Sequence, residues 1–322
     1  MKRLAAVLAA SLVCALASAA EIDKEALYKH IRKAFSIPPQ VELELKDLKP
    51  SGMPGFQEGL LESRYQGRSQ SQPLQISQDG RYYVLSGVYS LEPSKVPGLL
   101  SAKEEDAGVA GRVYFSPDAK RFVIGQPYDM TVDPDAPNRA KLRVSGVRGA
   151  RGSKNASVAL VEFSDLECPY CRGAHLALEK DLVKAYGGKV RWIFKQFPLV
   201  TIHPWAYRAA IADACATKLK ADAGWRVAQY FFENQPSINP GNVDAKAAEA
   251  AKSAGLDAGN FKSCYDKQGS KPQVDADVQE ANSLGVDSTP TFFVNGHKVS
   301  GFMSFEAFKP YIDTALADAS GK

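Results

Sequence analysis

The sequence has few of the cysteine and histidine side chains that zinc sites use: five cysteines and four histidines among 322 residues. Two of the cysteines form a Cys-x-x-Cys pair at Cys168 and Cys171, which could be half of a zinc site, a structural pair or a redox centre. A zinc site would need a second pair of ligands at similar spacing. Cys215 and Cys264 lie 49 residues apart, and no two histidines are three to five residues apart. Zinc is therefore disfavoured.

The sequence also lacks long apolar runs. After residue 20 no segment contains eighteen consecutive apolar residues, so we expect no transmembrane helix there. The start of the chain has the parts of a signal peptide: the positive Met1-Lys-Arg3, the short apolar Leu4–Leu16 and the small-x-small Ala17-Ser-Ala19. We expect residues 1–20 to be a signal peptide, cleaved near Ala19 or Ala20, and the mature protein to be periplasmic.

An excess of charge of either sign is missing as well. Removal of the signal peptide takes away Lys2 and Arg3 and leaves 38 basic against 36 acidic side chains. This balance argues against nucleic acid or an acidic ligand as the main partner. A mature length of about 300 residues suggests two domains, each able to bury its own core. In an exported protein the four remaining cysteines can persist as disulfides.

The Cys-x-x-Cys pair lies between a predicted strand and a predicted helix. Val158–Phe163 is a short apolar run of the kind that a buried strand uses. Pro169 suits the first turn of a helix that Cys168 would cap, and apolar residues at helical spacing continue to about Tyr186. The helix N-terminus would favour the thiolate of Cys168, and Cys171, one turn later, could attack a mixed disulfide on it. This arrangement is typical of a redox centre.

A second motif, Ser288-Thr-Pro-Thr-Phe-Phe-Val-Asn-Gly296, places Thr-Pro before an apolar strand and an Asn-Gly turn. Together with the strand, Cys-x-x-Cys and helix, it resembles the DsbA-like thioredoxin family of bacterial envelope proteins, over roughly residues 147–317. The resemblance implies a thiol–disulfide oxidoreductase. In it Cys168 would be the nucleophile, Cys171 the resolving thiol and Pro290 a cis-proline opposite them. The expected substrate contacts are Thr289, which would pair with an extended chain, and Pro169 and Tyr170.

The same resemblance implies a role for Glu162, six residues before Cys168. The family carries a buried acid at the matching position, which accepts protons for the second cysteine. Lys195, on the predicted strand Val190–Phe197, is a candidate partner for Glu162. The alternatives, a Glu162 that faces water and a solvated Lys195, stay open.

The resemblance also covers the two remaining cysteines. Relatives often pair cysteines at Ala-x-x-Cys-Ala and Phe-x-x-Cys-x-Asp, which match Ala212–Ala216 and Phe261–Asp266 here. In an oxidising compartment we expect a structural disulfide between Cys215 and Cys264. Free thiols in the core are the alternative.

The predicted fold is α/β: a thioredoxin fold with a helical insertion, preceded by a smaller α+β domain. An amphipathic helix, Glu21–Phe35, is followed by short alternating runs that predict β structure up to Val144. This helix and the hairpin sequence Ser77-Gln-Asp-Gly-Arg-Tyr82 loosely resemble the dimerisation domain of DsbC and DsbG isomerases, which implies a dimerisation or substrate-binding domain. The expected division is 21–145 for this domain, 146–157 for a linker, and 158–322 for the DsbA-like domain with its insertion at about 200–284.

The expected function is formation or isomerisation of disulfides in envelope proteins through the Cys-Pro-Tyr-Cys centre, without a metal or an organic cofactor. The partners would be unfolded or misoxidised exported proteins, a membrane redox partner (a quinone-linked oxidase or a DsbD-like reductant) and, for a homodimer, a second copy of the chain. The alternative is a periplasmic chaperone or holdase whose redox centre is secondary. Because Tyr170 replaces the histidine usual in DsbA and Glu167 adds a negative charge, we expect a reduction potential of roughly −150 to −220 mV, between those of thioredoxin and DsbA.

Overall fold

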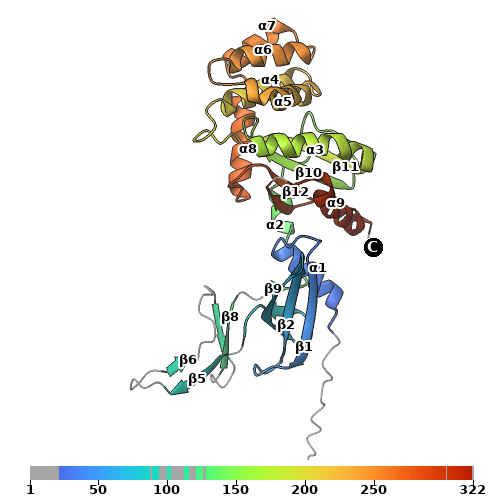
Figure 1. Ribbon diagram of the computed structural model, residues 1–322, viewed down its shortest axis with the longest axis vertical. Helices are drawn as coiled ribbons and strands as arrows, with labels where there is room; N and C mark the ends of the chain where they lie inside the picture. The colour runs from blue at the N-terminus through green and yellow to red at the C-terminus, as the bar shows by residue number, and fades with distance from the viewer. Residues whose placement is uncertain are drawn as a thin grey trace, which may run out of the picture. The chain divides into compact units, whose positions relative to one another are not determined.

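The structure is a computed structural model that describes residues 22–87, 89–93, 100–102, 112–115, 121–125, 128–301 and 303–320. The expected signal peptide, residues 1–20, lies outside the described residues. The chain divides into two compact units, whose helices and strands are drawn in Figure 1. The first unit comprises Met1–Tyr28 and Glu42–Thr131, and the second comprises Lys29–Val41 and Val132–Lys322.

The first unit contains an antiparallel sheet of order β1-β2-β3-β4-β9. Along β1, Leu43 and Leu45 are buried, as the period of two in a strand requires. The turn between β2 and β3 is Gln66-Gly67, and both residues have positive φ, as the favoured two-residue hairpin turns do. The strands are β1 (Glu42–Pro50), β2 (Phe56–Tyr65), β3 (Arg68–Ser77), β4 (Tyr82–Val84) and β9 (Tyr128–Asp129).

The first unit also contains the start of a helix and a second sheet. The predicted amphipathic helix is confirmed as α1 (Lys24–Ala34), although the unit itself ends within the helix, at Tyr28. Leu27 is fully buried, and the backbone N–H of Leu45 donates to the Tyr28 hydroxyl at 2.6 Å. The second sheet has the order β6-β5-β8-β7. Its strands are β5 (Tyr89–Pro93), β6 (Leu100–Ala102), β7 (Arg112–Phe115) and β8 (Arg121–Gly125).

The second unit has a four-stranded sheet of order β11-β10-β12-β13, in which β10 and β11 are parallel and the other pairs antiparallel. Apolar residues of α3 and α9 form one core with the sheet, and residues near the end of α8 form another. This is the predicted thioredoxin core. Its elements are β10 (Val158–Ser164), α3 (Pro169–Tyr186), a 3₁₀ turn (Gly187–Lys189), β11 (Val190–Gln196), α8 (Lys271–Ser283), β12 (Thr291–Val294), β13 (His297–Ser300) and α9 (Phe305–Ala319).

The helical insertion follows β11 and gathers at one end of the second unit (Figure 1). Its small and aromatic residues form a core of their own that also contains the two redox cysteines. The sequence predicts helices over residues 206–219, 224–234, 244–254 and 258–266, and each is confirmed within one residue at either end. They are α4 (Ala206–Leu219), α5 (Ala223–Asn234), α6 (Val243–Ser253) and α7 (Ala258–Asp266), with a 3₁₀ turn (Gln235–Ser237) after α5.

The segment before β10 differs from the sequence-based expectation. Only β structure was expected up to residue 144, but Ala136–Lys141 form the helix α2, which starts with a proline in its first turn. The expected linker, residues 146–157, belongs to the second unit, where the backbone of Arg151 pairs with that of Trp192 at 2.9 Å in both directions. These backbone hydrogen bonds hold the segment around Arg151 against β11.

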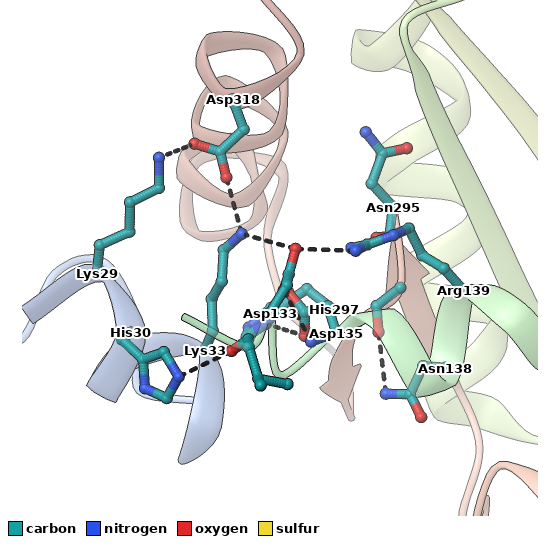
Figure 2. A network of polar contacts seen from close by, with 12 residues as sticks. Lys29, His30, Lys33, Asp133, Asp135, Asn138, Arg139, Asn295, His297 and Asp318 are labelled. Carbon is teal, nitrogen blue, oxygen red and sulfur yellow. Dashed lines mark hydrogen bonds and ion pairs between the residues drawn. The ribbon is translucent and has the colours of Figure 1, made fainter. Parts of the chain in front are cut away.

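A network of polar side chains holds residues 29–41 within the second unit (Figure 2). Lys29 and Lys33 both reach Asp318 of α9, at 2.5 and 3.0 Å. The same network fixes α2 and the turn between β12 and β13. Its other contacts join Lys33 to Asp133, Arg139 to Asp133 and to the Asn295 carbonyl, Asn138 to the Gly296 carbonyl, and His297 to Asp135.

The structure contains a disulfide between Cys215 of α4 and Cys264 of α7, the pair that the family resemblance implies. It closes a loop of about 50 residues, for which the chain-entropy model gives a stabilisation of the folded state of roughly 4 kcal/mol.

We expect the Cys215→Ala/Cys264→Ala variant to lose about that much free energy of unfolding in urea titrations. In wild type, peptide mapping should find this bond intact after mild reductant has opened Cys168–Cys171. Two free thiols at these positions would contradict the assignment.

Candidate active site

The two redox thiols lie where β10 passes into α3. Pro169 is the first residue of α3, so Cys168 directly precedes the helix and Cys171 lies in its first turn. Both thiols are free, and both are shielded from solvent, with Cys168 only 4% exposed. Tyr170 between them is 66% exposed. A partner protein that approaches the motif therefore meets Tyr170 first.

The Thr289–Pro290 segment lies against the nucleophile. The peptide bond between the two residues is cis, and the Thr289 carbonyl oxygen is 3.6 Å from Sγ of Cys168. Pro290 directly precedes β12, and its carbonyl accepts the backbone N–H of Gly301 at 2.8 Å. The fold thus brings together two motifs that are more than a hundred residues apart in the sequence.

The environments of the two thiols push their pKa values in opposite directions. A hydrogen bond from the Cys171 thiol lowers the pKa of Cys168 to about 6, and backbone N–H groups of the first helical turn add to this effect against the opposing effect of burial. Burial raises the pKa of Cys171 well above its ordinary value. At neutral pH Cys168 is therefore a thiolate beside a protonated Cys171.

Glu162 is completely buried on β10, so the alternative that it faces water is wrong. Its Oε2 atom lies 3.3 Å from Nδ1 of His175, and its Oε1 atom has no partner within the described part of the chain. Lys195 is not its partner, contrary to one sequence-based hypothesis. The Lys195 ammonium pairs with Glu280 at 2.5 Å, because Glu162 stands beside Phe194 in the sheet and Lys195 faces the other side.

His175 is a site residue that the sequence analysis missed. It is fully buried on α3, one helical turn after Cys171, and the spacing of four residues could have revealed it. A second donor to Glu162 was also missed: the indole Nε1–H of Trp192 donates to Oε2 at 3.0 Å. Four aromatic rings surround the imidazole at 4.8 to 5.4 Å between centroids: Trp192, Phe194, Trp225 and Phe232. These rings enclose the imidazole, so its Nδ1 contact with Glu162 is shielded from water.

The two acidic residues beside the cysteines, Asp165 and Glu167, accept hydrogen bonds from the loop between β11 and α4. Asp165 is buried and accepts from Nδ1 of His203 at 2.8 Å and from the Leu199 backbone N–H at 2.7 Å. Glu167 accepts from the Trp205 backbone N–H at 2.7 Å, and burial raises the pKa of its carboxyl. The main effect of these carboxylates is therefore to fix the loop between β11 and α4.

The helical insertion also reaches the redox motif. The Gln235 side chain, in the turn after α5, donates to the Cys168 carbonyl at 3.1 Å and to the Leu166 carbonyl at 3.0 Å. These bonds fix the backbone just before α3. The sequence offers no signal for them, because Gln235 lies 67 residues after Cys168.

Comparison with known proteins assigns the family. A family model described as Thioredoxin matches residues 145–314, which is more than half of the chain. The chain belongs to the thioredoxin family. The match begins at residue 145, so the likeness of the first unit to DsbC and DsbG stays a prediction.

Solved structures show the same fold in DsbA-like members of the thioredoxin family. Wolbachia pipientis α-DsbA1 is 23% identical, with a TM-score of 0.50, and the match covers 57% of this chain and 97% of that protein. BdbD from Bacillus subtilis is 25% identical, with a TM-score of 0.47, over 52% of this chain and 92% of BdbD. The fold found in α-DsbA1 is thus the fold of the second unit, and the predicted thioredoxin fold class is confirmed.

Curated relatives of this thioredoxin-family chain include much longer proteins. The Na⁺/H⁺ antiporter NhaA 3 of Salinispora tropica is 31% identical over 169 residues, which are 52% of this chain and 25% of the antiporter. The chain thus spans about a quarter of the length of this relative. In the part of this chain that the structure describes, no helix combines the length and the apolar character needed to cross a membrane.

The unequal thiols can be tested by alkylation. We expect iodoacetamide to modify Cys168 of the reduced protein with a midpoint near pH 6, because only the thiolate reacts, while Cys171 stays unmodified up to about pH 9. Mass spectrometry of the two peptides measures both rates. The control is Cys171→Ala, which removes the thiol donor and should raise the midpoint. Both cysteines titrating together near about pH 8.5 would contradict the assignment.

Proposed function

We propose that this thioredoxin-family protein is a thiol–disulfide oxidoreductase that forms or isomerises disulfide bonds in exported envelope proteins. The observation that carries the proposal is the pair of unequal thiols at the start of α3. Cys168, with a pKa of about 6, lies next to the Thr289 carbonyl, and a protonated Cys171 lies behind it. A nucleophilic thiolate next to a resolving thiol is what disulfide exchange requires.

The exchange proceeds in two balanced steps. The Cys168 thiolate attacks one sulfur of a substrate disulfide; a mixed disulfide forms, and the other substrate sulfur leaves as a thiolate. Cys171 then loses its proton and attacks Sγ of Cys168, which forms the Cys168–Cys171 bond and releases the second substrate thiolate. Oxidation of a dithiol substrate is the reverse sequence. Isomerisation needs only the first step, followed by attack of another substrate thiolate on the mixed disulfide.

The proton of Cys171 needs a buried acceptor, because Cys171 itself is fully buried. Glu162 and His175 supply one: the carboxylate has a free Oε1 atom, and the imidazole lies one helical turn below Cys171 on α3. A buried carboxylate paired with an imidazole can accept a proton while the net charge of the pair stays small. Glu162 therefore acts as the general base for the resolving step, and His175 positions it.

The surface around the motif suits an extended, partly unfolded substrate. Thr289 offers backbone groups beside Cys168, where a substrate chain would pair as an added strand. Tyr170 and, in the loop after β11, Val200 and Ile202 are exposed apolar side chains. Such side chains provide contact with apolar segments without a demand for one particular sequence.

The cellular setting follows from the signal peptide expected over residues 1–20. The mature protein would act in the periplasm on unfolded or misoxidised exported proteins. A membrane partner, either a quinone-linked oxidase or a DsbD-like reductant, would restore its redox state. The first unit would join two copies into a homodimer or bind substrate chains.

Two variants test the function. Cys171→Ser should accumulate mixed disulfides with envelope proteins through Cys168, because the resolving step is blocked, and Cys168→Ser should accumulate none. Trapped species are identified by mass spectrometry after diagonal gel separation. If protection of exported proteins survived in full in Cys168→Ser, a chaperone with a secondary redox centre would replace the proposed function.

The proton route gives a separate prediction. Glu162→Gln keeps the shape of the side chain but cannot accept the proton, so the resolving step should slow by about 100-fold, the lower range for general acid–base catalysis. Attack by Cys168 should keep its rate. Stopped-flow measurement of product release from a preformed mixed disulfide separates the two steps. Glu306→Gln, an exposed change in the first turn of α9, is the control. Equal slowing of both steps would assign Glu162 a purely structural role.

The direction of chemistry is set by the reduction potential. A Cys168 pKa of about 6 lies between those of the thioredoxin and DsbA nucleophiles, near 7 and 3.5, so we expect a potential of roughly −150 to −220 mV. Equilibration with a glutathione buffer measures it, and refolding of a scrambled multi-disulfide protein reports isomerase activity. A potential near about −120 mV without rescue of the scrambled protein would leave an oxidase alone.

A further inference from the structure

A cavity of about 570 Å³ lies in the second unit, apart from the redox motif. Its volume is in the range of small-molecule binding sites. Neither cysteine of the motif, nor Glu162, nor the Thr289–Pro290 segment lines it. Its walls are β11, α4 and the N-terminal turns of α5 and α8, and the exposed segment 143–148 forms part of its rim.

Two buried acceptor atoms in this cavity have no partner within the described residues. They are Oδ1 of Asp213 and Oε1 of Gln196, and the two side chains are only 6% and 3% exposed. The Gln196 amide donates to the other carboxyl oxygen, Asp213 Oδ2, at 2.6 Å. The free atoms thus belong to one hydrogen-bonded pair. Buried polar atoms almost always have a partner, so this pair indicates that one is supplied from outside.

The charges around the cavity leave Asp213 without a cation. Arg143 pairs with Asp277 at 3.1 Å and Lys195 with Glu280 at 2.5 Å, but no basic side chain in the described part of the chain pairs with Asp213. Burial raises the pKa of Asp213 to about 8 against the opposing hydrogen bond from the Gln196 side chain. Without a cation beside it, Asp213 is therefore mostly protonated at neutral pH.

We propose that this cavity binds the cationic head of a small organic ligand, a protonated amine, amidine or guanidinium, with Asp213 as its counter-ion. The N–H groups of such a head match the free acceptors of Asp213 and Gln196, since charge-assisted bonds to a carboxylate are the strong ones. Phe194 and Trp225 add apolar wall for the rest of the ligand. An anion without N–H or O–H groups would leave Oε1 of Gln196 unpaired and could not serve as a counter-ion for an ionised Asp213.

Binding of a permanent cation is coupled to proton release. Below about pH 8 the ligand must displace the proton of Asp213, so its affinity should rise by about tenfold per pH unit between pH 6.5 and 7.5 and level off above pH 8. The other titratable and charged groups at the cavity and its edge come from four parts of the chain. They are Lys195 on β11, Lys218 on α4, Asp277 and Glu280 on α8, and Arg143 and Arg148 before β10. Of these, Asp277, whose pKa burial raises to about 6, titrates below this window.

Three matched probes test the ligand chemistry on the full mature chain. Phenylguanidine is a cation with N–H donors, phenylurea has a similar shape but no charge, and phenyltrimethylammonium is a cation without N–H donors. Isothermal titration calorimetry over the stated pH range should show that phenylguanidine binds at least tenfold more tightly than either of the others. Equal binding of phenylurea, or no binding of phenylguanidine near pH 8.5, would overturn the proposal.

Two variants test the assigned residue. Asp213→Asn keeps the size of the side chain but cannot ionise, so it should weaken phenylguanidine at least tenfold and remove the pH dependence. The control Asp222→Asn removes an exposed carboxylate just before α5 that pairs with Arg226, and it should leave binding unchanged. Unchanged binding in Asp213→Asn would refute the assignment; if that variant does not fold, the pH profile of wild type decides. Cys168→Ser should bind as wild type does, so this outcome is independent of the redox function.

Discussion

The unequal hydrogen bonding and burial of two sulfur atoms is the constraint on which the site depends. Cys168 accepts hydrogen bonds at the start of α3, whereas Cys171, three residues later, is buried among side chains. A thiol whose folded pKa is about 6 and whose unfolded pKa is near 9 stabilises the reduced protein increasingly as pH rises from 6 to 9. Stabilising the reduced form makes the disulfide form more oxidising. The same asymmetry therefore makes Cys168 the more nucleophilic thiol and raises the reduction potential of the pair.

This asymmetry is maintained by parts of the chain that lie far from the motif. The Thr289 side chain, whose hydrogen bond helps to lower the pKa of Cys168, comes from the segment before β12. Gln235 of the insertion donates to the Cys168 carbonyl. The loop between β11 and α4 is tied to Asp165 through His203 and thus lies beside the motif. The insertion is consequently a support for the redox centre as well as a cover, and its own disulfide, between α4 and α7, keeps that support rigid.

Residue patterns that are local in the sequence predicted many of the helices of the second unit. Pro169 marks the start of α3, and the helices of the insertion were predicted within one residue at either end. The short helix α2 was missed because it has only six residues and buries none of them, so it leaves no amphipathic pattern. The Trp192 partner of Glu162 was missed for another reason. It depends on the register between β10 and β11, which is fixed by packing across the sheet rather than by any neighbour in sequence.

Two buried carboxyls illustrate how the surroundings decide what an acid can do. Each loses hydration on burial, a cost that must be offset by hydrogen bonds or by a change in protonation. Glu162 has an imidazole nitrogen and an indole N–H beside it within the chain, and these contacts offset part of that cost. Asp213 has only the Gln196 amide, which offsets less of the cost and leaves its carboxyl protonated at neutral pH. A charge on Asp213 at neutral pH thus requires a cation from outside the chain. The polar contacts of Glu162, in contrast, come from His175 and Trp192 of the chain itself.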